Sequence, residues 1–272
     1  MKILVVRRDN IGDLICTTPL IAALRQAYPS AYIAALVNSY NAPVLEGNAD
    51  LDQVYVYSKY KHVRGEQPRL AWVYSRLKLL WQLRRQQFDW AILARTGFDI
   101  HGLRFAHQIK PKKILGFAPI DRTEPLLTVP VAEGPGEHEH EVELTFRLLD
   151  ALGIHAAPGP LKLAVPSLAK QELADRAPEL FTKKPLIAFH ISAREESRQW
   201  PLNKWQALGR FVLEKTAYNI LLLWAPGKSD DPLHPGDDEL AESLSCDLAS
   251  IGCLPFLRKR SVNWLWRWSR LI

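Results

Sequence analysis

Apolar and polar positions along the chain form blocks that predict strands and helices in alternation. An apolar run at residues 3–6 leads into the polar turn 7–13, and apolar residues then recur at helical spacing over 14–27. The same order continues with expected strands at 31–37, 53–57, 88–94 and 112–117, and expected helices at 70–87, 101–109 and 138–152. This rhythm predicts a parallel sheet with right-handed crossovers.

Proline changes the prediction at two places. Pro19 favours a first helix that starts nearer Thr17 or Thr18, with a hydroxyl group as its cap. Residues 119–136 are rich in Pro, Gly and Thr, so we expect an irregular segment there.

The rhythm restarts after a Pro- and Gly-containing segment at 153–166, which we expect to be a linker. Strands are expected beyond it at 185–191 and 219–224, with helices at 167–176, 201–215 and 237–244. The chain is therefore predicted to be an α/β protein of two successive doubly wound domains that face each other across a cleft. We place them at residues 1–157 and 158–272.

Composition narrows the class of partner. The hydrophobic content of 47% and charged content of 24% are typical of a globular protein, and the net charge of +6 favours anionic partners. The three cysteines have no paired spacing, which fits a reducing compartment. No signal peptide and no apolar run of membrane-spanning length is recognisable, so we expect a cytoplasmic protein, either free or peripheral at a membrane.

Asp13 is the first candidate for chemistry. It follows the first predicted strand, at the edge of the sheet where ligands bind, and could act there as a general base on a hydroxyl group. A helix cap, or an ion pair with Arg7 or Arg8, explains the same position. Both interpretations stay open on the residues alone.

A charged loop from His190 to Pro201 is the second candidate. It follows a predicted buried strand and precedes a helix that starts with proline, and its Arg194 and Arg198 could bind phosphates. A merely solvated loop is the alternative.

The third candidate is a group of basic residues, which could form one basic wall of an acceptor-binding site or be ordinary surface. The group comprises Arg7, Arg8, Arg95, Arg104, Lys110, Lys112 and Lys113. No dinucleotide fingerprint, P-loop or metal-binding motif is present, and His138 and His140 are expected as helix caps or surface rather than metal ligands. No motif for nucleic-acid binding accompanies the basic charge.

Several segments resemble glycosyltransferase family 9, the bacterial heptosyltransferases of lipopolysaccharide core assembly. They are KILVVRRDNIGDLICTTPLIAALRQAYP, AYIAALVN, FDWAILARTGFDIHGLRFAHQIKPKKILGF, HEHEVELTFRLLDALGI and PLIAFHISAREESRQWPLNKWQAL, which together extend over roughly residues 1–240. The resemblance implies a GT-B fold of two Rossmann-like domains, the first for the acceptor and the second for a nucleotide-sugar donor. It also implies inverting transfer without metal or other cofactor.

The resemblance assigns roles to individual residues. Asp13 matches the catalytic base, and Arg198 falls where a Lys usually holds the donor phosphates; Arg keeps the charge but changes the geometry. The expected donor-binding residues are His190, Ser192, Arg194, Arg198 and Trp200, and the expected acceptor-binding residues are Arg7, Gly12, Thr17 and Arg104. We therefore expect transfer of heptose or a related sugar, from ADP-heptose, to a lipopolysaccharide core acceptor, with possible contact with the inner membrane surface.

The sequence departs from the family near its end. An Asp-Gly-Gly-x-x-His segment that binds the donor nucleotide in the family has no counterpart here, and residues 251–272 carry five Arg or Lys and no acid. We expect the second domain to be incomplete, with 251–272 a truncated or out-of-frame end; a basic aromatic membrane anchor is the alternative. The alternative function is a non-catalytic remnant that retains acceptor or anion binding.

Overall fold

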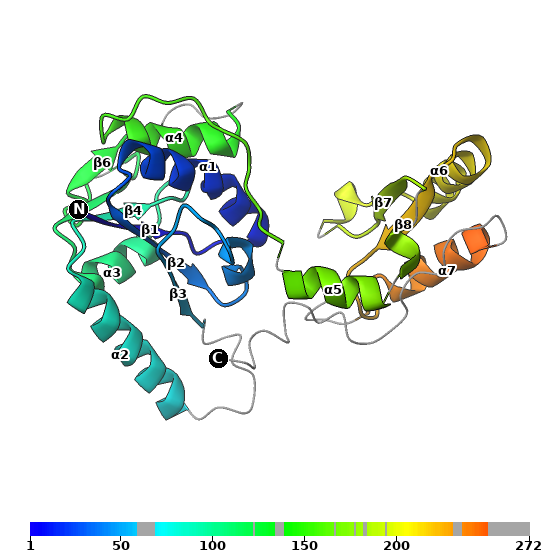
Figure 1. Cartoon of the computed structure of the whole chain (residues 1–272), viewed down its shortest axis with the longest axis horizontal. Helices are drawn as coiled ribbons and strands as arrows, with labels where there is room; N and C mark the ends of the chain where they lie inside the picture. The colour runs from blue at the N-terminus through cyan, green and yellow to red at the C-terminus, as the bar shows by residue number, and fades with distance from the viewer. Residues whose placement is uncertain are drawn as a thin grey trace. The chain divides into compact units, whose positions relative to one another are not determined.

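The computed structural model describes residues 1–58, 69–121, 123–133, 139–165, 167–176, 178–181, 184–193, 195–230 and 236–249. The chain divides into two compact units, one formed by Met1–Pro166 and one that begins at Ser167 (Figure 1). The expected linker, residues 153–166, has neither helix nor strand at its described residues 153–165 and is held on the first unit. The Lys162 backbone N–H donates to Thr18 Oγ1 at 2.9 Å, and Lys162 Nζ lies 2.6 Å from Asp50 Oδ2.

The first unit is built on a six-stranded parallel sheet in the order β3-β2-β1-β4-β5-β6. Its strands are β1 (Lys2–Val6), β2 (Tyr32–Asn38), β3 (Gln53–Tyr57), β4 (Trp90–Leu93), β5 (Lys113–Phe117) and β6 (Val129–Val131). The strand order reverses between β1 and β4, and ligands of such sheets bind outside the carboxyl ends of the strands at that switch point. The doubly wound fold class predicted from the sequence is confirmed.

Helices cover both faces of this sheet. Helices α1 (Ile11–Ala27) and α4 (Glu141–Asp150) share one core with residues such as Val5 and Ile92, and α1 also contacts the short 3-10 helix η1 (Ala42–Leu45). Helices α2 (Arg69–Gln86) and α3 (Ile100–Ile109) pack on the opposite face. Burial on both faces explains why β1 and β2 are almost continuously apolar.

Helix α1 begins earlier than Pro19 led us to expect. It starts at Ile11, and Asp13 Oδ2 accepts a hydrogen bond from the Asn10 backbone N–H at 2.8 Å. Pro19 lies inside the helix, where its missing N–H leaves the Ile15 carbonyl without its usual donor. Thr18 Oγ1 donates to that carbonyl at 2.7 Å, so the hydroxyl compensates for the proline and the predicted start at Thr17 or Thr18 is wrong.

Strand β6 lies in the segment that the sequence predicted to be irregular. It spans only three residues and contains Pro130, which cannot donate to a neighbouring strand. Because β6 is at the edge of the sheet, its proline is tolerated there.

The second unit contains a smaller strand–helix–strand core. Its elements are α5 (Ser167–Arg176), η3 (Pro178–Phe181), β7 (Leu186–His190), η4 (Glu196–Arg198), α6 (Leu202–Lys215), β8 (Asn219–Leu223) and α7 (Asp238–Ala249). Strands β7 and β8 are parallel, and Phe189, Val212 and Leu222 belong to the core. Gly209 lets α6 approach α7, since a Cβ atom there would lie 2.6 Å from a Leu248 methyl group.

Within the part of the chain that the structure describes, no helix has both the length and the apolar character needed to cross a membrane.

Candidate active site

Arg7 is the centre of a group of carboxylates at the carboxyl end of β1. Only 2% of its side chain is exposed, and its Nη1 donates to the Ala94 carbonyl, directly after β4. The guanidinium pairs with Glu141 of α4, lies 3.2 Å from Asp9 Oδ2 through Nε, and lies 3.8 Å from Asp13 Oδ1 through Nη2. We call Arg7, Asp9, Asp13 and Glu141 the Arg7 cluster; it joins β1, α1 and α4 at the switch point.

The two oxygens of Asp13 have different surroundings. Oδ2 caps α1 through Asn10, whereas Oδ1 is 3.8 Å from Arg7 Nη2, beyond hydrogen-bond distance. The side chain is partly exposed, so Oδ1 can accept a hydrogen bond from a ligand. The structure thus shows the cap and the ion pair that the sequence left open, and neither occupies Oδ1 as a hydrogen-bond acceptor.

Two predicted acceptor-binding residues, Arg7 and Thr17, are buried. Thr17 Oγ1 donates to the Asp13 carbonyl at 2.9 Å, so this side chain faces the helix backbone instead of a ligand. Gly12, by contrast, is exposed, and a Cβ atom built on it would meet nothing within 4 Å. Open space therefore lies beside the N-terminus of α1, where backbone N–H groups favour anionic or hydroxyl oxygens.

Two further arginines surround Tyr57 at the carboxyl end of β3. Arg8 Nε donates to Tyr57 Oη at 2.8 Å, and the Arg76 guanidinium lies 3.3 Å from the Phe105 ring centroid and 5.6 Å from that of Tyr57. Burial, with the nearby Arg8 charge, lowers the pKa of Arg76 to about 10. We call Arg8, Tyr57, Arg76 and Phe105 the Tyr57 cluster; its two cations would gain from an anion.

The basic wall predicted from the sequence is only partly assembled. Arg7, Arg8 and Arg95 share the carboxyl edge, and Arg95 Nε lies 3.8 Å from Asp9 Oδ2. Three lysines precede or begin β5 and therefore lie at the amino ends of the parallel strands, on the other side of the sheet from these arginines; they are Lys110, Lys112 and Lys113. Arg104 is on the exposed face of α3, and among the described residues no hydrogen bond or ion pair links it to either cluster.

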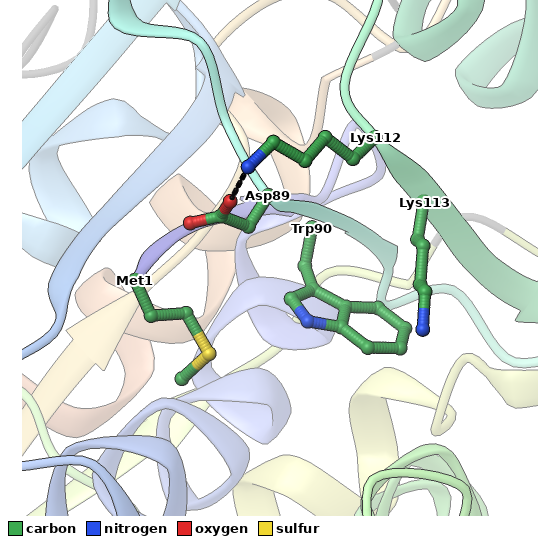
Figure 2. Close-up of a pocket in the computed structure, with 5 residues that line it drawn as sticks. All are labelled: Met1, Asp89, Trp90, Lys112 and Lys113. Atoms are coloured by element: carbon green, nitrogen blue, oxygen red, sulfur yellow. Dashed lines mark hydrogen bonds and ion pairs between the residues drawn. The ribbon is translucent and has the colours of Figure 1, made fainter.

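A pocket of about 360 Å³ lies at the amino ends of the strands and is lined by Met1, Asp89, Trp90, Lys112 and Lys113, whose side chains are drawn in Figure 2. The Asp89 carboxylate accepts from Lys112 Nζ and from the Lys2 backbone N–H, both at 2.7 Å. These two hydrogen bonds hold the pKa of Asp89 below its usual value. The Asp89 carboxylate already has two hydrogen-bond donors, and the pocket lies away from the carboxyl ends of the strands. We therefore assign Asp89 a structural role.

The carboxyl ends of β7 and β8 carry the candidate residues of the second unit. Ser192 Oγ accepts from the Ala225 backbone N–H at 2.7 Å and so joins the two strand ends, while His190 Nδ1 lies 3.1 Å from the Ser192 carbonyl oxygen. Arg198 is exposed and pairs with Glu195 at 3.0 Å. Trp200 meets Trp205 edge to face, with ring centroids 5.1 Å apart.

The remaining predictions from the sequence have mixed outcomes. Arg194 and His138 lie outside the described residues. His140 is confirmed as a helix cap, because its Nδ1 accepts from the Val142 backbone N–H at 3.2 Å. Asp9 and Glu141 were missed as partners of Arg7; the acid at the start of α4 was the only sequence signal for Glu141.

Cys16, beside the Arg7 cluster, is not activated as a nucleophile. Burial raises the pKa of its thiol, and the charges of Glu141 and Asp13 raise it further, whereas Arg7 opposes them. The cluster therefore favours acid–base chemistry through carboxylates over chemistry through a thiolate.

Comparison with known proteins shows which family the chain belongs to. The family described as glycosyltransferase family 9 (heptosyltransferase) matches residues 76–252, which is well over half of the chain. The chain belongs to glycosyltransferase family 9. Lipopolysaccharide heptosyltransferase 3 of Escherichia coli strain K12 is 23% identical over 243 residues, which cover 80% of the chain and 62% of that relative. The chain thus spans about three fifths of that relative's length.

Solved family 9 structures share the fold. A family 9 glycosyl transferase from Veillonella parvula superposes with a TM-score of 0.72 at 17% identity, covering 90% of the chain and 66% of that structure. The E. coli heptosyltransferase WaaC with ADP-2-deoxy-2-fluoro heptose gives a TM-score of 0.66 at 18% identity, covering 97% of the chain and 78% of that structure. The GT-B-like α/β fold class expected from the resemblance is thereby confirmed.

Proposed function

We propose that this family 9 protein transfers a heptose from a nucleotide-sugar donor to a lipopolysaccharide core acceptor, with Asp13 as general base. The observation that carries the proposal is Oδ1 of Asp13 at the switch point: it accepts no hydrogen bond from the described residues, while the other oxygen of the carboxylate caps α1. The donor class, ADP-heptose, is proposed by analogy with the solved WaaC complex with ADP-2-deoxy-2-fluoro heptose. The acceptor class follows from the E. coli relative named as a lipopolysaccharide heptosyltransferase.

In this proposal an acceptor hydroxyl donates a hydrogen bond to Asp13 Oδ1. As the hydroxyl oxygen forms a bond to the anomeric carbon, its proton passes to Asp13 and the nucleoside diphosphate leaves from the opposite face, which inverts that carbon. Of the expected acceptor-binding residues, we assign Arg7 and Thr17 a positioning role, because Arg7 is buried against the carboxylates and Thr17 Oγ1 donates to the Asp13 carbonyl.

The Tyr57 cluster supports an anionic acceptor. Arg8 and Arg76 bring two positive charges to one aromatic side chain, and Arg95 adds a third at the same edge of the sheet. Asp99 Oδ1 lies 3.9 Å from Arg8 and 4.0 Å from Arg95, and phosphate or carboxylate groups of a core oligosaccharide would offset the remaining positive charge. Gly12 leaves space for the sugar, and Arg104 remains a proposed contact farther along the acceptor.

We assign donor binding to the loop that follows β7. Arg198 would pair with the diphosphate, supported by Arg194, while Trp200 offers an exposed aromatic face. His190 and Ser192 set the backbone of that loop through the contacts described above.

Transfer without a metal and a place at the cytoplasmic face of the inner membrane remain parts of the proposal. The Arg7 guanidinium offsets part of the negative charge of Asp9, Asp13 and Glu141, so the proposal assigns no cation to these carboxylates. Unchanged turnover in the presence of a chelator is the outcome that this part of the proposal requires.

The experiment that tests the proposal compares wild type with Asp13→Asn in a transfer assay. An asparagine oxygen can still cap α1, so folding is preserved, but the amide cannot take the proton and we expect turnover to fall by about 10²- to 10⁴-fold. Asp50→Asn, which removes a charge paired with Lys162 in the same unit, is the matched control and should retain activity. Comparable turnover of Asp13→Asn and wild type would remove Asp13 as the base.

A further inference from the structure

Helix α2 carries apolar side chains on two opposite faces. Its inner face buries Leu79 and Leu83 in the core shared with α3. A second row faces outward and remains exposed; it consists of Leu70, Val73, Tyr74, Leu77 and Trp81. With 3.6 residues per turn these five positions fall within roughly 100° of arc, so they form one continuous stripe, the outer stripe of α2.

The described residues of the first unit do not account for the outer stripe. A helix that covers a sheet needs a single apolar stripe, and α2 already contacts α3 and β3 through its inner face. Figure 1 shows α2 at the edge of the first unit, with α3 on its inner side. Leu77 and Trp81 are 59% and 58% exposed, and five such neighbours exceed the scattered apolar residues of an ordinary surface.

The charged side chains of α2, beside the outer stripe, are all positive. Helix α2 contains five Arg or Lys residues and no Asp or Glu. Lys78 and Arg85 flank the outer stripe, and the Arg85 guanidinium lies 4.7 Å from the centroid of the Trp81 ring. Leucine, tyrosine and tryptophan on one face with flanking cations are typical of a helix that lies in the interface of an anionic membrane.

We infer that the outer stripe of α2 docks the protein on an anionic lipid surface. A second copy of the chain is a poorer partner, because pairing two such helices through the stripe would bring cation-rich rows together without an acid. Residues 251–272 also carry five cations and no acid, so this segment has no charge complementarity to α2. Lipid phosphates supply the missing negative charge, and acyl chains accept Leu77 and Trp81.

The test is flotation of the full chain with phosphatidylcholine vesicles that contain phosphatidylglycerol, against vesicles of phosphatidylcholine alone. We expect wild type to prefer the anionic vesicles and to release from them as salt rises. Leu77→Glu/Trp81→Glu should weaken this binding at least about tenfold, and the uncharged Leu77→Gln/Trp81→Gln should weaken it less. The matched control is Phe211→Glu/Tyr218→Glu, which adds the same charge at exposed residues of the second unit and should bind like wild type.

Three outcomes would overturn the inference. They are no binding of wild type to either vesicle, equal binding of the α2 variants and the control, and a dimer by light scattering that the α2 variants dissociate without any effect on vesicles. Circular dichroism checks that each variant is folded. The assay uses lipid alone, so its result is independent of sugar transfer and of Asp13.

Discussion

Arg7 of the first unit and Arg198 of the second are both placed at the carboxyl ends of parallel strands, yet their environments differ. Arg7 is 2% exposed and contacts oxygens from the turn after β1, from α1, from α4 and from the residue after β4. The Arg198 side chain is 73% exposed, and its ion pair is with Glu195, three residues away in its own loop.

This difference separates two ways of preparing a site. The first unit positions Asp13 before any ligand arrives, because the Arg7 cluster is fixed by packed elements. In the second unit the side chain of Arg198 is held by one local ion pair, which contributes little in water and can be exchanged for a phosphate. We therefore expect substitutions of Arg7 to change stability and substitutions of Arg198 to change ligand affinity.

Arg7→Gln should have the largest effect. Removing Arg7 takes the buried cation away from Asp9, Asp13 and Glu141 and leaves the half-exposed Arg95 near Asp9, and we expect a loss of about 3 kcal/mol in the free energy of unfolding. Urea unfolding followed by circular dichroism measures this loss. The matched control is Arg95→Gln, which removes the same charge from a half-exposed side chain near Asp9 and should cost less than about 0.5 kcal/mol. Equal stability of the two variants would mean that Arg7 does not organise the cluster.

The sequence predicted most of the fold because strands and helices differ in the period of their apolar residues. It failed at α1, where Pro19 was given more weight than the Thr18 hydroxyl that bonds to the Ile15 carbonyl. It also failed at β6, whose three residues are too short to show a period and owe their pairing to β5.

The candidate site was predictable only where its residues are neighbours in sequence. Arg7 and Asp13 flank one turn, so their proximity followed from the first strand and helix. Glu141 is 134 residues from Arg7 and meets it because α1 packs against α4, a contact that no local pattern reports. Lys112 and Lys113 do not join Arg7 in the basic wall for a related reason: residues at the start of a parallel strand and residues at its end lie on opposite sides of the sheet.

Arg198→Gln tests the other side of the comparison and should have a smaller effect. We expect unchanged unfolding but about tenfold weaker binding of ADP by calorimetry, which corresponds to about 1.4 kcal/mol for a lost contact between guanidinium and phosphate. Arg198→Lys should restore most of the affinity because the charge returns. The control is Arg210→Gln, an exposed arginine of α6 paired with Asp247, which should bind ADP like wild type.

An unstable Arg198→Gln variant with normal ADP affinity would contradict the assignment of Arg198 to the donor. Failure of wild type to bind ADP would instead favour the alternative function, a chain that retains only acceptor or anion binding.

The smallest expected effect is a difference in reactivity between two cysteines. It tests the same contrast, between the packed Arg7 cluster and the exposed residues of the second unit, in the wild-type protein. Burial, with Glu141 and Asp13, raises the pKa of the Cys16 thiol, whereas Cys246 in α7 is exposed. Because only the thiolate reacts, iodoacetamide near neutral pH should modify Cys246 about tenfold faster than Cys16, as followed by peptide mass spectrometry. Raising the pH should speed Cys16 modification, because more of its thiol with raised pKa is then converted to the thiolate. Glu141→Gln should also speed the modification of Cys16, because a carboxylate that raises the pKa of this thiol is removed. Equal modification rates at Cys16 and Cys246 would contradict the view that the Arg7 cluster is closed and fixed by packed elements.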